Sequence, residues 1–350
     1  MEHDINKYSE EITSTSLLEL CLNEEWEIIE SLIPTKINEW DFTETDYIGN
    51  TPLLVCCKKG SLSTVKAFHK VLETFNVFEC NKKGTTMLLI SCMSGNIELV
   101  QWLLEHGSNL NERNKDGYTC ILCAVFKGQQ ALAEWLLEKG RTLHEKNYDG
   151  YTCTIIASFN EHFELLQWLV ENGASTTDKD KQGNTCLLHA SCNGDLQMIQ
   201  WLLQNGSSVK EINNEGSSCI ILASLYGHLE TIIWLFQNGC SITEKNRFGE
   251  TCLTMASKRG HLDVIKWLVE NGCSLAETSF SGTCIMQAAK NSRLETVIWM
   301  LSNGSSIDEN TVLDWSGEIV DVGETCEEIL KRKGMYENVK RAMTTKSSRK

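Results

Sequence analysis

The chain has 350 residues, roughly two to three times the length of an ordinary domain, so it forms either several domains or one extended repeat array. Hydrophobic residues make up 41% and charged residues 23%, which excludes an intrinsically disordered chain. The formal net charge of -15 disfavours a nucleic-acid partner, because phosphate binding needs a surface rich in lysine and arginine.

The amino-terminal residues 1–14 are polar and acidic, whereas a signal peptide is basic and then apolar. No later run approaches about eighteen apolar residues, so we expect no membrane insertion. The sixteen cysteines are spread over a large chain without an export signal, which favours reduced thiols over a disulfide framework. We therefore expect a cytoplasmic protein, with the nucleus as the alternative.

Residues 1–45 match the rest of the chain only weakly, through the segment TSLLEL at 15–20. Further along, three residue types recur together at a step of 33 residues, which predicts a repeat array. The rows are Gly84, Gly117, Gly150, Gly183, Gly216 and Gly249; Trp102, Trp135, Trp168, Trp201, Trp234 and Trp267, with Trp299 after 32; and Ala124, Ala157, Ala190, Ala223 and Ala256, continued by Ala288.

One repeat unit shows how the period folds. In residues 183–190 (GNTCLLHA) the hydroxyl of Thr185 can cap a helix that starts at Cys186 and ends near Gly194. A second helix begins near Asp195, carries apolar residues at spacings of three and four, and ends before Gly206. Neither helix can bury its apolar stripe alone, so neighbouring units must stack and share one core.

The repeated pattern resembles the ankyrin repeat, on GNTPLL at 49–54 and EHGSNLN at 105–111, with repeat threonines along nearly the whole chain. The resemblance implies an all-α solenoid of helix-turn-helix units joined by hairpin-like loops. It divides the chain into a tail and divergent capping repeat at 1–45 and eight ankyrin repeats at 46–308. An inserted loop at 309–322, a divergent carboxy-terminal capping repeat at 323–343 and a basic tail at 344–350 complete it.

The chain departs from the family pattern at two positions. The usual proline is cysteine in seven repeats, and the usual histidine is replaced by Leu, Ile or Thr, so helix stacking should be more apolar. We interpret the cysteines as small buried residues, because stacked helices lie about 8–10 Å apart and a disulfide needs closer α-carbons. A thiol-based metal or redox sensor is the alternative. The cysteines are Cys120, Cys153, Cys186, Cys219, Cys252, Cys284 and Cys326.

Other repeated residues invite chemical interpretations that the period explains better. The tryptophans occupy a leucine position of the second helix, so we expect core packing. His162, His228 and His261 lie between the two helices of their units, and their repetition indicates structure. No phosphate loop, nucleophile elbow or HExxH motif is present, so we expect no enzyme activity, no cofactor and no metal site.

The resemblance implies partner binding in a concave groove made by the loop tips and the first helices, so positions where the repeats differ are the informative ones. Aromatic and basic residues at such positions are common interface anchors. The alternative is that each aromatic side chain is tucked against a neighbouring repeat. Acids that repeat at one loop position (Glu112, Glu145, Asp178, Glu211 and Glu244) could form an acidic edge that steers a basic partner, although a charged, solvated rim is the ordinary expectation. The candidate partner-binding residues are Phe126, Lys127, Phe159, Asn160, Tyr226, Lys258 and Arg259 on the first helices, and Tyr118, Tyr148, Tyr151 and Phe248 at the loop tips.

The sequence therefore predicts a non-catalytic scaffold or adaptor that is monomeric on its own and binds a partner protein or peptide in its groove. A third hypothesis is a substrate adaptor for ubiquitin transfer, although no recruitment box is recognisable.

Overall fold

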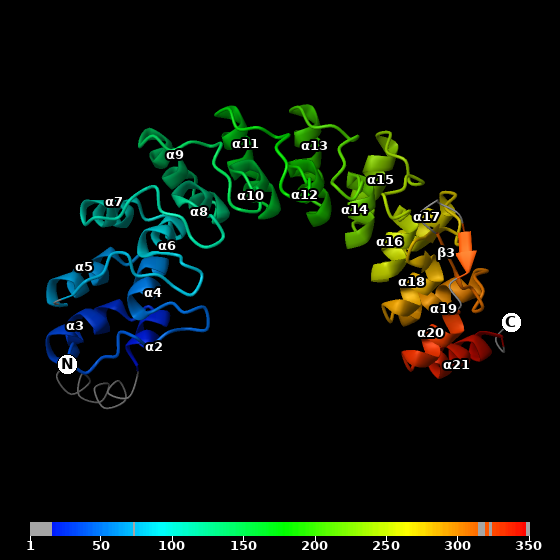
Figure 1. Ribbon diagram of the computed structural model, residues 1–350, viewed down its shortest axis with the longest axis horizontal. Helices are drawn as coiled ribbons and strands as arrows, with labels where there is room; N and C mark the ends of the chain where they lie inside the picture. Colours follow the sequence, from blue (N-terminus) through cyan, green and yellow to red (C-terminus); the bar gives the residue numbers. More distant parts are fainter. Residues whose placement is uncertain (1–15, 73, 314–318, 322–323, 348–350) are drawn as a thin grey trace, which may run out of the picture. The chain divides into compact units, whose positions relative to one another are not determined.

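The computed structural model describes residues 16–72, 74–313, 319–321 and 324–347. The chain divides into two units, Met1–Ala174 and Ser175–Lys350. Each unit is a series of helix pairs, in which a short first helix is followed by a turn and a second helix (Figure 1). None of the helices within the described residues has the length and apolar character needed to cross a membrane.

Within its described residues, the first unit contains five helix pairs. They are α2 (Leu17–Leu22) with α3 (Trp26–Lys36), α4 (Pro52–Lys59) with α5 (Leu62–Val71), α6 (Met87–Ser94) with α7 (Ile97–Glu105), α8 (Cys120–Phe126) with α9 (Gln130–Glu138), and α10 (Cys153–Phe159) with α11 (Phe163–Glu171).

The described part of the second unit contains five further pairs and two short hairpins. The pairs are α12 (Cys186–Asn193) with α13 (Leu196–Gln204), α14 (Cys219–Tyr226) with α15 (Leu229–Gln237), α16 (Cys252–Arg259) with α17 (Leu262–Glu270), α18 (Cys284–Lys290) with α19 (Leu294–Ser302), and α20 (Cys326–Arg332) with α21 (Tyr336–Ser347). The strands are β1 (Thr278–Ser279), β2 (Gly282–Thr283), β3 (Thr311–Leu313) and β4 (Ile319–Asp321), paired β1 with β2 and β3 with β4.

Most first helices begin with a threonine cap, as predicted. The hydroxyl accepts the amide of the residue three positions on at Thr51, Thr86, Thr152, Thr185, Thr251, Thr283 and Thr325. Thr119 and Ser218 are exceptions: neither caps its helix, and neither hydroxyl finds a partner among the described residues. The prediction for Cys186 to Gly194 is confirmed, since α12 ends at Asn193 and Gly194 takes the left-handed conformation with φ 75°.

The same threonines also hold the loop that ends each repeat. The hydroxyl of Thr86 donates to Glu112, and that of Thr185 donates to Glu211. The second oxygen of each carboxylate accepts a loop amide, from Asn109 at 2.8 Å and from Ser208 at 2.7 Å. Equivalent bonds join Thr51 to Glu79 and Thr251 to Glu277.

The predicted acidic edge is therefore wrong. Glu112 and Glu211 are half-buried and bonded as just described, and Glu145 is buried beside Arg141, with 2.5 Å between its carboxylate and the guanidinium. Asp178 and Glu244 are also only half-exposed. Glu112, Glu145 and Glu211 bond groups of their own repeats, so the row as a whole is not a free rim for steering a partner.

The core lies along the first helices, which pack on one another in order: α4 on α6 and α6 on α8, and likewise α12, α14, α16 and α18. The alanine row and the cysteines at the first helical position are fully buried. The residues that replace the family histidine are also buried, so the stack is apolar as expected; they are Leu89, Leu122, Ile155, Leu188, Ile221 and Thr254.

The tryptophan row contributes less to the core than expected. Trp102 is buried, but the other six members are only half-buried. The residue that follows each tryptophan takes the interior position and is fully buried in every case. These residues are Leu103, Leu136, Leu169, Leu202, Leu235, Leu268 and Met300. The indole rings therefore cover the edge of the core from the second helices.

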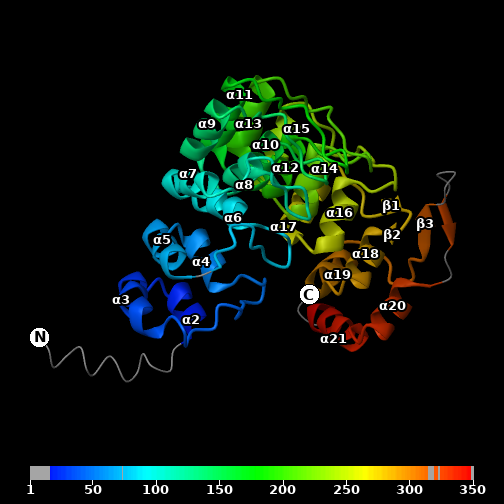
Figure 2. The ribbon, with the colours of Figure 1, turned by 60° about the vertical axis from the view of Figure 1, so that its left-hand side comes forward.

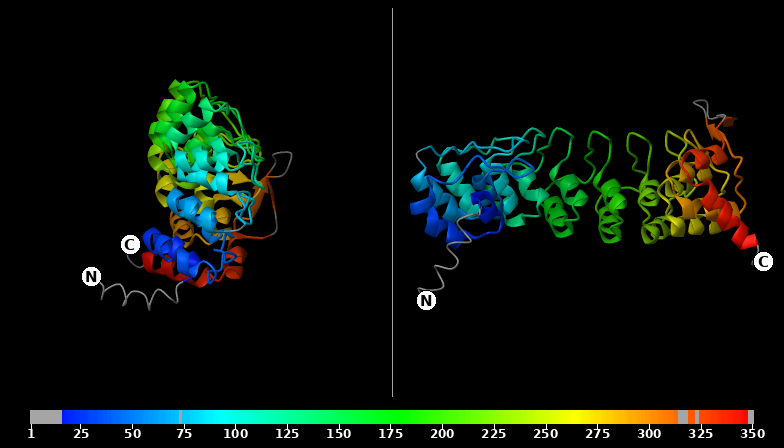
Figure 3. Two further views of the ribbon diagram at one scale, coloured as in Figure 1. Left: turned by 90° about the vertical axis from the view of Figure 1, so that its left-hand side faces the viewer. Right: turned by 90° about the horizontal axis from the view of Figure 1, so that it is seen from below.

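The loops between pairs are tied together by asparagines that the sequence analysis did not single out. The side chain of Asn114 accepts the amides of Asp116 and Tyr118 and donates to Thr85 at 3.4 Å. The backbone amide of Tyr148 then donates to the carbonyl of Asp116 at 2.9 Å. Gly117 is required between them, because its φ is 83° and an added Cβ would lie 2.7 Å from the Tyr148 backbone nitrogen. Within each unit the loops project to one side of the helices (Figure 3).

The carboxy-terminal boundaries differ from those expected. The segment 309–322, expected to be a loop, contains the β3–β4 hairpin, and β3 packs against β1 and β2 (Figure 2). The helix α21 runs to Ser347, four residues into the expected tail. Residues 1–15, in the expected amino-terminal tail, lie outside the described residues.

Replacing Thr185 by alanine removes the cap of α12 and the donor to Glu211. We expect the free energy of unfolding to fall by about 1–2 kcal/mol, the usual effect of losing such a cap. Urea denaturation followed by circular dichroism measures the change. Thr185→Ser keeps the hydroxyl and should retain most of the stability, whereas an alanine variant as stable as the wild type would contradict this role.

Candidate partner-binding groove

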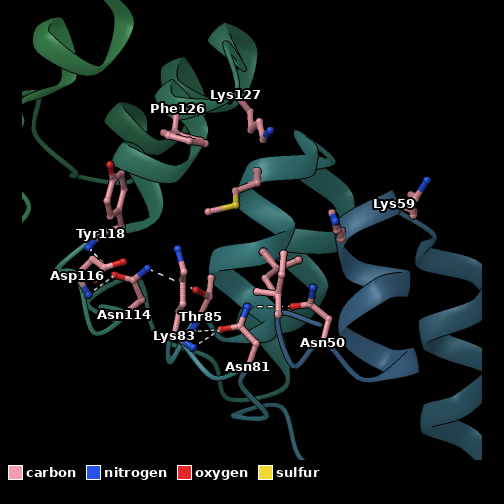
Figure 4. Close-up of a pocket in the computed structure, with 14 residues that line it drawn as sticks. Asn50, Lys59, Asn81, Lys83, Thr85, Asn114, Asp116, Tyr118, Phe126 and Lys127 are labelled. Atoms are coloured by element: carbon pink, nitrogen blue, oxygen red, sulfur yellow. Dashed lines mark hydrogen bonds between the residues drawn. The ribbon is translucent and has the colours of Figure 1, made fainter. Parts of the chain in front are cut away.

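A pocket of about 580 Å³ opens on the first unit, where three successive helix pairs contribute residues to it (Figure 4). Its lining comes from the loops before α4, α6 and α8 and from the ends of these helices. The lining residues are Ile48, Asn50, Lys58, Lys59, Asn81, Lys83, Thr85, Ile90, Met93, Asn114, Asp116, Tyr118, Phe126 and Lys127.

Two aromatic rings form one wall of the pocket. Tyr118 stands just before α8 and Phe126 is its last residue, and their rings meet edge to face with centroids 5.9 Å apart. Both side chains are half-buried. Burial raises the pKa of Tyr118 to about 12, and its neutral hydroxyl can donate a hydrogen bond.

The loop ends supply polar groups that already bond one another. Asn81 donates to the side chain of Asn50 at 2.9 Å, and its own oxygen accepts the amides of Lys83 and Thr85. Asn114 repeats this arrangement in the next repeat (Figure 4). This ladder holds three loops in register and therefore fixes the side of the pocket that faces the aromatic wall.

Positive charge surrounds the apolar surface. Four lysines and one carboxylate line the pocket, and the side chains of Lys58, Lys83 and Lys127 are exposed. The ammonium of Lys127 lies 5.5 Å from the centroid of the Phe126 ring, a cation–π contact. Lys59 is paired with Glu24 at 2.5 Å, so its charge is partly compensated.

Three of the eleven candidate binding residues, Tyr118, Phe126 and Lys127, lie together in this pocket. Four others belong to the next helix pair and do not line it. Tyr151 stacks on Phe159 with centroids 6.2 Å apart, Asn160 bonds the carbonyl of Ile156 in its own helix, and Tyr148 is 56% exposed. Phe159 is 50% exposed, so this pair offers a further aromatic surface.

The remaining four candidates lie in the second unit. Tyr226 is 48% exposed and stacks on His228, while Phe248 is 38% exposed at a loop tip. Lys258 is paired with Glu250 at 3.3 Å, and Arg259 is exposed. None of them lines the pocket of the first unit.

Most of the other lining residues could have been found from the sequence by counting from the repeat threonine. Phe126 stands seven residues after Thr119, and the same position is Met93 in the preceding repeat and Lys58 in the one before. Lys83 and Ile48 likewise correspond to Asp116. The variable positions singled out from the sequence begin at Phe126 and leave out the two preceding repeats, which complete the pocket.

The repeated histidines have a structural role. The Nε2 atom of His228 lies 2.7 Å from the carbonyl oxygen of Cys192, and that of His261 lies 3.0 Å from the carbonyl of Leu225. His162 approaches the carbonyl of Phe126 at 3.3 Å. Each imidazole thus reaches the end of the first helix of the preceding repeat.

The thiols give no support to a metal or redox centre. Fourteen of the sixteen cysteines are buried, and burial raises the pKa of Cys57 to about 12. No group of three or more potential metal ligands occurs within the described residues. The sulfurs of Cys21 and Cys56, at equivalent positions of the first two pairs, are 3.7 Å apart, closer than the helix spacing led us to expect, but both remain free thiols.

Stacked helix pairs with linked loops define the class of the protein as a helical repeat solenoid. Models of ankyrin repeats (3 copies) match residues 17–114, 53–147, 154–246 and 220–311, and a model of ankyrin repeats (many copies) matches residues 126–170. The chain therefore belongs to the ankyrin-repeat family, whose members are generally protein–protein interaction modules and typically non-catalytic. A search of curated proteins found no match.

Burial predicts a strong contrast in thiol reactivity, because the reacting species is an accessible thiolate. In the native protein we expect a thiol-specific reagent to modify Cys80, which is exposed, quickly and Cys192 more slowly. The other cysteines should react only after unfolding. Mass spectrometry of peptides after brief alkylation gives the order. A Cys80→Ser variant should lose the fast phase, and rapid labelling of Cys120 or Cys153 would contradict the assigned burial.

Proposed function

We propose that the protein is a non-catalytic adaptor that holds an extended segment of a partner protein in the pocket of the first unit. The carrying observation is the pocket itself, in which an aromatic wall faces a fixed ladder of loops. Its volume of about 580 Å³ is within the usual range for binding sites, roughly 300–1,000 Å³.

The positions that line the pocket support this proposal. The capping threonines, buried alanines and loop glycines recur along the array, whereas the residue seven positions after the threonine changes from Lys58 to Met93 to Phe126. A repeat scaffold keeps the residues that stack its units and varies those that contact a partner. The pocket combines these variable positions with the recurring asparagines of the loops.

The lining contains no serine, cysteine or histidine, and Asp116 is its one carboxylate. It therefore does not offer the paired nucleophile and base of a serine or cysteine hydrolase. The thiol-sensor and ubiquitin-adaptor hypotheses gain no support from these observations, and the free cysteines suit a reducing compartment such as the cytoplasm.

The test uses the full chain and a displayed library of random twelve-residue peptides. Peptides selected on the wild type are synthesised, and their affinities are measured by fluorescence polarisation. Phe126→Ala should weaken binding by about tenfold or more, because buried aromatic anchors contribute most of the binding energy at interfaces. Met93→Ala tests the pocket at the equivalent position of the preceding repeat.

The matched control is Phe236→Ala, which removes an exposed aromatic residue from the second helix α15. This variant should bind as the wild type does. Circular dichroism and thermal unfolding verify that each variant is folded. If every selected peptide binds the Phe126→Ala and Met93→Ala variants with unchanged affinity, the proposed pocket is not the binding site.

A further inference from the structure

The charge of the pocket is opposite to that of the chain. The protein carries a formal charge of -15, yet the pocket is lined by Lys58, Lys59, Lys83 and Lys127 against Asp116 alone. We infer that the occupant of the pocket is an acidic peptide segment, in which aspartate or glutamate side chains flank an apolar or aromatic anchor. This inference rests on the proposed function and names the chemistry of the partner.

Three of the lysines are available to a ligand. Among the described residues, no carboxylate lies within ion-pair distance of Lys58, Lys83 or Lys127. All three are exposed at the pocket, so a bound carboxylate would approach each of them without first displacing an internal partner. The internal pair with Glu24 places Lys59 in a secondary role.

The arrangement of charge and apolar surface favours a mixed peptide over a purely acidic one. The ammonium of Lys127 lies above the Phe126 ring, and Met93 and Ile90 contribute apolar surface from the preceding repeat. An aromatic or aliphatic side chain seated against Phe126 would place a neighbouring acidic residue near Lys127. The asparagine ladder, already bonded internally, positions the loops without adding charge.

The pocket suits an acidic peptide better than a nucleic acid. Its lining contains lysines but no arginine, so it offers point charges and no guanidinium that would hold a phosphate or a carboxylate through two parallel hydrogen bonds. Bases of nucleic acid stack on open aromatic faces, and the edge-to-face packing of Tyr118 and Phe126 already uses a face of one of these two rings. The overall negative charge of the chain also opposes a polyanion that extends beyond the pocket.

The experiment repeats the selection of displayed twelve-residue peptides on three forms of the full chain. One is the wild type, the second carries K58Q, K83Q and K127Q, and the third carries K66Q, K70Q and K139Q. The third form loses the same charge from exposed lysines on or beside the second helices, outside the pocket. Sequencing before and after selection gives the enrichment of acidic residues.

We expect peptides selected on the wild type and on the control to be enriched in aspartate and glutamate beside an apolar residue. The pocket variant should lose this enrichment and bind the selected acidic peptides about tenfold or more weakly. Affinity for the wild type should also fall as salt is raised, because exposed charges are screened over about 10 Å at 0.1 M ionic strength.

The outcomes separate this inference from the proposed function. Selected peptides that depend on Phe126 but show no acidic excess, or that bind the pocket variant unchanged, would overturn the inference and leave the adaptor proposal standing. Peptides that bind independently of Phe126 and Met93 would overturn both. A labelled oligothymidine is tested in the same way. If it binds the wild type more tightly than the acidic peptides do and loses binding in the pocket variant, the occupant of the pocket is a nucleic acid and the inference is overturned.

Discussion

No helix pair in this chain can bury its apolar face without a neighbour, and the other features of the fold follow from that constraint. The helix α8, the first of its pair, has seven residues, of which six are buried, and an isolated helix of this length is not stable in water. Each such helix leaves unpaired backbone amides at its start. A threonine cap satisfies one of these amides in most first helices, and the loop glutamates and the asparagine ladder bind amides of the loops, so the polar rows are as necessary as the apolar ones.

The sequence predicted the parts of the fold that depend on local rules. The preferences of single residues predict the cap at Thr185, the start of α12 at Cys186 and its end before Gly194. The same residue types recur at these positions in other repeats, which strengthens the prediction. It failed where the partner of a residue lies far along the chain. Glu112 looked like part of an acidic rim because the threonine that donates to it, Thr86, is 26 residues away.

The tryptophan row shows a second limit of the sequence. A tryptophan and the leucine that follows it are both apolar, so periodicity alone cannot tell which one enters the core. The structure buries Leu136 fully and leaves Trp135 half-exposed. The pocket was equally hard to predict: the comparison of repeats identified Phe126 as variable, but the hollow depends on how Met93 and Lys58 fill the same position in the two preceding repeats.

The helix that carries the aromatic wall is also one that breaks the capping rule. α8 starts after Thr119, whose hydroxyl makes no cap bond, although the backbone of the helix is otherwise regular. A missing cap costs about 1 kcal/mol, which would matter for an isolated helix. Here α8 is held by its contacts with α6 and α9, so the stack tolerates the loss. The same tolerance explains why residues at the helix ends can change from repeat to repeat: stability resides in the shared core, and the residues that contact a partner are free to differ.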